Sequence, residues 1–265
     1  MEVREPHPEE LDQLSRLPDG SLPPEWSSWA DEPHRTLVAA HGGVVAAAIH
    51  LAVVGRGEGW VEGVRAGEDG EVQSRLVQAA LSVLDGYGAA TVRTALPVGA
   101  SPPWLAQAGF GPAARFEVRL APRQFSAVPR ARPVAPRGVG AACTRLDSAL
   151  TSRAAGLVPL GWRWRAFVRE MATAAAREGR LLADDAGGVA LFLRRGPDRL
   201  VAALVGDHPL DLLGCVQEEV QGTGRLVCFL AAASPEAQAL SCWPAHPWCP
   251  EGVVVYQLTR VTGRR

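Results

Sequence analysis

The chain has 265 residues, of which 47% are hydrophobic and 21% charged, and its formal net charge is −1. This composition excludes a disordered chain and is sufficient for two domains of ordinary size. A net charge so close to zero also argues against a general attraction to nucleic acid or to an anionic membrane.

The N-terminus and the cysteines indicate a cytoplasmic protein. No apolar run of about 18 residues occurs that could span a membrane. The first residues, MEVREPHPEEL, carry charges where a signal peptide would be apolar. Five cysteines are an odd and scattered set, which does not suggest a disulfide framework.

Hydrophobic periodicity predicts alternating strands and helices through the first half. The expected elements are an edge strand at 1–4, a helix at 7–17, a turn-rich segment at 18–33 with a short helix around Trp26 and Trp29, hairpin strands at 35–40 and 44–53, a strand at 60–66, a helix at 71–84, a strand at 90–98, a short helix at 104–108 and a closing strand at 114–120. The helix at 71–84 is the clearest of these, because Val72, Leu76, Ala80 and Leu84 share one face.

A proline-rich segment, 123–136, separates the two halves and is predicted to be an extended interdomain linker. The expected elements after it are a helix within 161–178, hairpin strands at 180–183 and 189–193, a strand at 199–205, a helix at 208–220, a strand at 225–231, a short helix opened by Ser234 and a last strand at 253–258. ALPVGASPPW around Ser101 parallels CFLAAASPEA around Ser234. Two copies of one fold, at 1–122 and 137–265, are therefore expected.

The order of elements resembles the GNAT superfamily of acyl-CoA N-acyltransferases. WVEGVRA, SRLVQAALSVL, ATVRTAL and WLAQAGF carry the resemblance in the first half, and VVVYQL ends a more divergent second copy. The resemblance implies an α+β fold with three α/β layers, in which two tandem copies each contain a mixed, mostly antiparallel sheet flanked by helices. It also implies acetyl-CoA as co-substrate and an amine that attacks the thioester directly.

In such proteins a splayed strand pair holds the pantetheine arm, and the amides before the central helix hold the pyrophosphate. Carried onto this sequence, the implied cofactor contacts are Val64, Arg65, Ala66, Val72, Gln73, Ser74 and Arg75. Glu62 occupies the strand position where many members hold the carboxylate that accepts the amine proton. The alternative for Glu62 is an ordinary strand residue on the solvent face.

Two features depart from the family pattern. The pyrophosphate turn, Q/R-x-x-G-x-G/A in the family, is replaced by a turn with the acids Glu68, Asp69 and Glu71, whose charges oppose a diphosphate. The Tyr that protonates the leaving thiolate is expected near Leu105 and is not found there. Tyr87 is predicted to be structural and Tyr256 to pack in a core.

Other chemically notable residues have structural explanations that we favour. Cys242, His246 and Cys249 could supply three metal ligands, but their spacing matches no common zinc pattern and a surface loop is preferred, so no metal is expected. The tryptophans of Trp162-Arg163-Trp164-Arg165 could line an acceptor pocket or pack between helices. His50 is interpreted as a half-buried strand residue.

Two functions follow from the resemblance. The first is an N-acyltransferase that acetylates an amine of a small molecule or peptide, with one half catalytic. The second is an inactive GNAT-like binding or regulatory protein that has lost the cofactor turn. The chain is expected to be a monomer or a homodimer, and the second half could also cover an open sheet edge of the first.

Overall fold

The computed structural model describes residues 1–14, 17, 34–66, 69–125, 127 and 130–260. The chain divides into two compact units, Met1–Pro112 with Val255–Arg265, and Ala113–Val254. None of the described helices is both long and apolar enough to cross a membrane.

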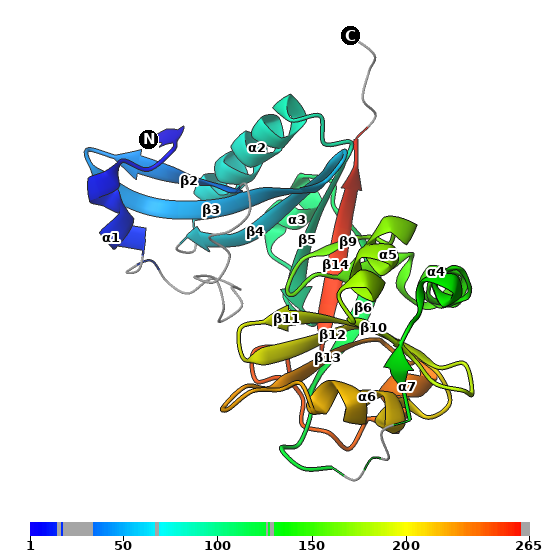
Figure 1. The fold of residues 1–265 in the computed structure, drawn as a ribbon. Coiled ribbons are helices and arrows are strands. Elements are labelled where there is room, and N and C mark those ends of the chain that lie inside the picture. Colours follow the sequence, from blue (N-terminus) through cyan, green and yellow to red (C-terminus); the bar gives the residue numbers. More distant parts are fainter. Residues whose placement is uncertain (15–16, 18–33, 67–68, 126, 128–129, 261–265) are drawn as a thin grey trace. The chain divides into compact units, whose positions relative to one another are not determined.

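The first unit is a mixed sheet with its main helix, α2, across one face (Figure 1). Its described elements are β1 (Glu2–Arg4), a 3-10 turn (Pro8–Glu10), α1 (Leu11–Leu14), β2 (His34–His41), β3 (Val44–Gly55), β4 (Glu58–Ala66), α2 (Gly70–Gly86), β5 (Thr91–Pro97), α3 (Pro103–Gln107) and nearly all of β14 (Val253–Thr259). The strand order is β1-β2-β3-β4-β5-β14. Strands β1 to β4 pair antiparallel, and β4 pairs parallel with β5.

The local sequence explains this arrangement. Gly42 and Gly43 have φ angles of 58° and 81°, which glycine adopts without strain, so the chain reverses tightly between β2 and β3. The apolar face of α2 includes Leu76, Ala80 and Leu84, all 0% exposed, which pack on the sheet. The predicted hairpin and the predicted amphipathic helix are both present.

The second unit repeats the pattern. Its elements are β6 (Gly111–Leu120), β7 (Arg132–Pro133), a 3-10 turn (Pro136–Gly138), α4 (Val139–Ala154), β8 (Leu157–Pro159), β9 (Trp164–Ala166), α5 (Arg169–Arg177), β10 (Leu181–Ala183), β11 (Val189–Arg195), β12 (Asp198–Val205), α6 (Pro209–Gln217), β13 (Leu226–Ala231) and α7 (Pro235–Ala239). The strand order is β6-β13-β12-β11-β10-β7, with β12 and β13 parallel. The three-layer mixed fold predicted from the sequence is confirmed.

The closing strands are exchanged relative to the predicted division at 1–122 and 137–265. Strand β6 ends the first sequence copy but pairs antiparallel with β13 of the second unit, from Phe116 opposite Ala231 to Leu120 opposite Val227. Strand β14 ends the chain but lies next to β5, and its Leu258 packs on the first core. The units therefore differ from the expected halves by one strand each.

Three further predictions differ from the structure. No element was expected at Val139–Ala154, which is α4, and the helix expected within 161–178 covers only Arg169–Arg177 after the β8–β9 hairpin. The segment predicted as a linker contains β7, which pairs with β10. In the first unit the helix expected at 7–17 is a 3-10 turn followed by α1. The expected helix around Trp26 and Trp29 lies outside the described residues.

Candidate functional site

The two parallel strands of the first unit diverge at the place the resemblance assigns to a cofactor. The described pairing of β4 with β5 runs from Glu58 opposite Thr91 to Trp60 opposite Arg93, whereas β4 continues to Ala66. Beyond Trp60 the described ladder between β4 and β5 therefore ends. We call this the β4/β5 divergence.

A β-bulge shapes β4 within the divergence. His50 of β3 lies opposite Glu62, but Ala48 lies opposite Arg65, so β4 has one extra residue between these pairs. Gly63 in this stretch has a φ angle of 43°, a left-handed conformation that glycine tolerates best. Bulges of this kind redirect side chains and are common beside active sites.

Glu62 lies on the face of the sheet opposite α2. Its neighbour Val61 belongs to the core under α2, and alternation along a strand turns Glu62 the other way. The residue is 4% exposed, so the alternative of a solvent-facing strand residue is wrong. Burial of a carboxylate in mid-sheet is costly unless its environment is polar, and such groups are frequent at active sites.

His50 faces Glu62 across the strands and is also buried, at 5% exposed rather than half-buried as predicted. Its Nδ1 lies 3.0 Å from Oγ1 of Thr36, which is opposite His50 in the β2–β3 pairing. Thr36, His50 and Glu62 thus form a polar row across three strands. A carboxylate beside an imidazole can accept a proton and pass it on.

The amides at the start of α2 are occupied by the chain itself. The Asp69 carboxylate caps the helix, with Oδ1 accepting hydrogen bonds from the amides of Glu71 at 3.0 Å and Val72 at 3.2 Å. The Gln73 amide donates to the Asp69 carbonyl at 3.2 Å. A diphosphate at the start of α2 would have to compete with the Asp69 carboxylate, which already accepts hydrogen bonds from two amides of the helix.

The other predicted cofactor contacts also have partners within the first unit. The Ser74 hydroxyl donates to Gln107 Oε1 at 2.5 Å, joining α2 to α3. Arg75 forms an exposed ion pair with Glu71 at 2.7 Å. Arg65 Nη1 donates to the carbonyl of Leu14 at 3.0 Å. The structure thus brings Arg65, Ser74 and Arg75 to one region, where each makes a hydrogen bond or an ion pair within the first unit. Glu68 lies outside the described residues.

Neither described tyrosine lies at the place expected for the thiolate acid. Leu105, at that place, is buried in the first core. Tyr87 is the C-cap of α2, and the Arg35 guanidinium lies 5.4 Å from its ring centroid. Tyr256 on β14 is partly buried against the same core, as predicted.

The corresponding divergence in the second unit is filled. Strands β12 and β13 pair in parallel from Arg199 opposite Leu226 to Val201 opposite Cys228, and β12 continues to Val205. The space beyond has a volume of only about 20 Å³ and is lined in part by Leu150 of α4.

Glu236 satisfies the polar groups of this filled space. It is 2% exposed and accepts hydrogen bonds from the amide of Gly206 at 3.1 Å and from Arg153 Nη1 at 3.0 and 3.1 Å. Gly206 belongs to the turn that precedes α6, the counterpart of the pyrophosphate turn. A carboxylate of the chain therefore holds a donor that an anionic cofactor would need.

The remaining candidates of the second unit are structural. Trp162 and Trp164 pack on the sheet, with ring centroids 5.2 and 5.7 Å from Phe229, so packing between helices is not their role. His246 is buried, 4.9 Å from Trp162, and burial followed by the charge of Arg225 lowers its pKa to about 4. No cluster of three potential metal ligands occurs among the described residues.

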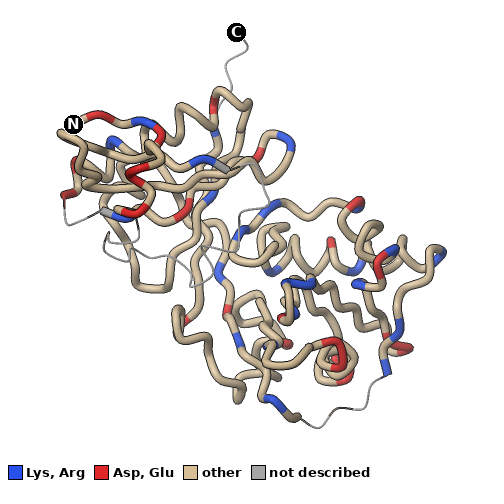
Figure 2. Tube along the Cα trace, turned by 60° about the vertical axis from the view of Figure 1, so that its left-hand side comes forward, with Lys and Arg blue, Asp and Glu red and all other residues tan. Residues whose placement is uncertain are grey.

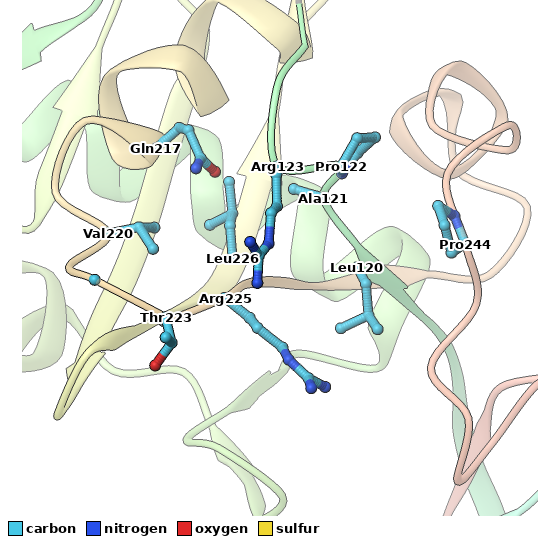
Figure 3. A pocket seen from close by; sticks show the side chains of 12 residues that line it. Leu120, Ala121, Pro122, Arg123, Gln217, Val220, Thr223, Arg225, Leu226 and Pro244 are labelled. Atoms are coloured by element: carbon cyan, nitrogen blue, oxygen red, sulfur yellow. The ribbon is translucent and has the colours of Figure 1, made fainter.

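A separate hollow of about 660 Å³ opens in the second unit between the end of β6, the end of α6 and the start of β13 (Figure 3). Arg123 and Arg225 extend into it beside Thr223. The hollow begins at Leu226, the first residue of β13, whereas the β12/β13 divergence begins after Cys228. It is therefore distinct from the cofactor position implied by the fold.

Comparison with known proteins gives the fold. Neither a protein-family model nor a curated protein matches the chain. Among solved structures, a GCN5-related N-acetyltransferase from Sphaerobacter thermophilus aligns with a TM-score of 0.60 at 14% identity, covering 100% of this chain and 97% of that one. A candidate acetyltransferase from Thermoplasma acidophilum aligns with a TM-score of 0.57 at 14% identity, covering 98% and 100%.

A second candidate acetyltransferase, from Pyrococcus horikoshii, aligns with a TM-score of 0.56 at 15% identity over 100% of this chain and 91% of that one. The chain thus has the fold of the GNAT acyltransferases along its whole length, and the resemblance expected from the sequence is confirmed. At these identities the likeness establishes the fold alone.

Proposed function

We propose that the protein is an acyl-CoA-dependent N-acyltransferase and that the first unit carries the reaction. The observation that supports this most is the placement of Glu62, which is buried in mid-strand, two residues beyond the last β4–β5 pair. The GNAT fold provides the context, because it places a cofactor arm in a divergence of this kind.

The proposal assigns the steps to residues of this chain. Acetyl-CoA, when bound, supplies a thioester. The backbone of Val64, Arg65 and Ala66 would hold its arm along the edge of β4 that faces β5. Glu62 would take the proton from the attacking amine of a small molecule or peptide. The new C–N bond forms as the C–S bond breaks, and the thiolate leaves.

The second unit is assigned a supporting role. Its divergence is filled by α4, and its turn amide is held by Glu236, which is itself paired with Arg153. Displacing this arrangement would leave the buried Glu236 carboxylate without its partners, which is unfavourable by roughly several kcal/mol. One cofactor site per chain is the consequence.

One observation favours a second candidate, an inactive GNAT-like binding module. Asp69 occupies two amides at the start of α2 and places a negative charge where a diphosphate is expected. Under this alternative the divergence has lost its cofactor, and the polar row around Glu62 stabilises the fold or binds another partner.

The test is acetyl transfer to a panel of amines, followed as release of the CoA thiol. We expect turnover with at least one amine class, and Glu62→Gln should lower kcat/KM by about 100-fold, as for loss of a general base. Glu218→Gln, an exposed carboxylate of the second unit, is the matched control and should leave the rate unchanged. Turnover that survives Glu62→Gln would remove the assigned role, and no turnover with any amine would favour the inactive module.

A further inference from the structure

Three arginines of the second unit surround a cavity of about 380 Å³. Arg137 comes from the 3-10 turn before α4, and Arg169 and Arg177 come from α5. The lining residues Arg169, Thr173, Ala176 and Arg177 are spaced by four, three and one, so they lie on one face of α5. The cavity is separate from the filled β12/β13 divergence and from the hollow of Figure 3, with which it shares no lining residue.

No acidic residue lines this cavity. Within the described part of the chain, no hydrogen bond or ion pair engages the guanidinium of Arg137, Arg169 or Arg177. Elsewhere basic and acidic residues are interspersed, as the view of Figure 2 shows, and several arginines pair with a carboxylate, as Arg194 does with Glu219 at 2.8 Å. Three like charges around one cavity repel each other unless an anion is present.

One of the three guanidinium groups lies close to the start of α4. A Cβ built at Gly140, in the first turn of α4, would lie 3.4 Å from Arg169 Nη2, so this guanidinium lies over that turn. Helix α4 has 16 residues and follows directly on the 3-10 turn, whose Pro136 carbonyl accepts a hydrogen bond from the Val139 amide. The partial positive charge of the turn adds to the field of the three arginines.

The remaining walls are apolar. Val134, Val139 and Ala176 line the cavity together with Pro136. The volume lies in the range of small-molecule sites and exceeds what a bare phosphate ion requires. A guanidinium group can donate two parallel hydrogen bonds to two oxygens of one phosphate, whereas a lysine ammonium acts as a point charge.

We propose that this cavity binds a small organic phosphate monoester, with the phosphate between Arg137, Arg169 and Arg177 and the organic part against the apolar wall. The site is independent of the proposed acyl transfer in the first unit.

Calorimetric titration with phenyl phosphate at fixed ionic strength tests the proposal, with inorganic phosphate as the second probe. We expect saturable 1:1 binding of phenyl phosphate, at least about five-fold tighter than inorganic phosphate. Arg169→Gln and Arg177→Gln should each weaken it by about ten-fold, which corresponds to loss of one charged hydrogen bond. All three arginines are exposed, so these variants should fold, and circular dichroism checks this.

Arg123→Gln is the matched control, because it removes an exposed arginine of the same unit that extends into the other hollow. Its affinity for phenyl phosphate should equal that of wild type. An equal loss in Arg123→Gln, or no saturation in wild type, would overturn the site. Equal affinity for inorganic phosphate would overturn the assignment to an ester. Titration of Glu62→Gln with phenyl phosphate separates this result from the proposed function, since that affinity should not change.

Discussion

The Asp69→Asn variant tests whether the charge of Asp69 weakens binding of acetyl-CoA at the start of α2. Asn caps a helix about as well as Asp, so the hydrogen bonds to the amides of Glu71 and Val72 can persist while the charge is lost. The free energy of unfolding should fall by less than about 1 kcal/mol, from the lost interaction with the helix dipole. The change therefore removes a charge with little effect on the fold.

The effect on affinity follows from Coulomb's law. Asp69 is exposed, so the dielectric of water applies, and two unit charges about 5 Å apart then repel each other by about 1 kcal/mol. A diphosphate carries about two charges, and salt screens part of the repulsion. Asp69→Asn should thus bind acetyl-CoA about ten-fold more tightly than wild type at low ionic strength.

Calorimetry at low and high salt measures this difference. Asp85→Asn is the matched control, since it makes the same substitution at an exposed position near the other end of α2. It should leave the affinity unchanged, and the gain in Asp69→Asn should shrink at high salt. An unchanged or weaker affinity in Asp69→Asn would refute the competition between this carboxylate and the cofactor.

Three predictions concern stability. Glu236→Ala should lower the free energy of unfolding by about 2 kcal/mol in urea, because it leaves a buried amide and Arg153 without their acceptor; a loss under about 0.5 kcal/mol would contradict the pairing. The pKa of His246 is about 4 in the fold and near 6.5 when unfolded, so stability should be complete above pH 6.5 and fall by up to about 3 kcal/mol toward pH 4. His246→Gln should flatten the dependence of the free energy of unfolding on pH. An unchanged dependence would mean that other groups cause it. Gly59→Ala should cost about 1–2 kcal/mol in thermal unfolding, since the new methyl would lie 3.0 Å from both Leu84 methyl groups; an unchanged Tm would mean that the core yields there.

The sequence predicted those elements whose signals are local. Spacing along α2 and the Gly42-Gly43 turn determine structure within a few residues, and both were predicted correctly. The exchange of β6 and β14 depends on pairing between residues more than 100 positions apart, such as Phe116 with Ala231, which periodicity does not report.

The candidate site shows the same difference between features with a local sequence signal and features that depend on distant residues. The position of Glu62 followed from the resemblance, but its burial and its pairing with His50 depend on which face of the sheet is covered. The charge of Asp69 predicts that it opposes a diphosphate, and its position just before a helix is also the local signal of the N-cap that the structure shows. Helix α4 was missed although Val139, Ala142, Leu146 and Leu150 recur at three and four residues, because small residues weaken the apolar stripe.

The filling of the β12/β13 divergence in the second unit could not be predicted from the sequence. It depends on Arg153 of α4 and Glu236 of α7 meeting across 83 positions at the turn before α6. No local pattern indicates that pairing, and the proposal of one cofactor site per chain rests in part on it.

The most direct test of the central claim is calorimetric titration of the whole chain with acetyl-CoA, with free CoA for comparison. We predict a dissociation constant in the micromolar range, about −8 kcal/mol, and one site per chain, because the proposal places the cofactor at the β4/β5 divergence and the β12/β13 divergence leaves a space of only about 20 Å³. Two sites per chain would contradict the assignment to the first unit, and no binding at millimolar ligand would contradict the transferase itself.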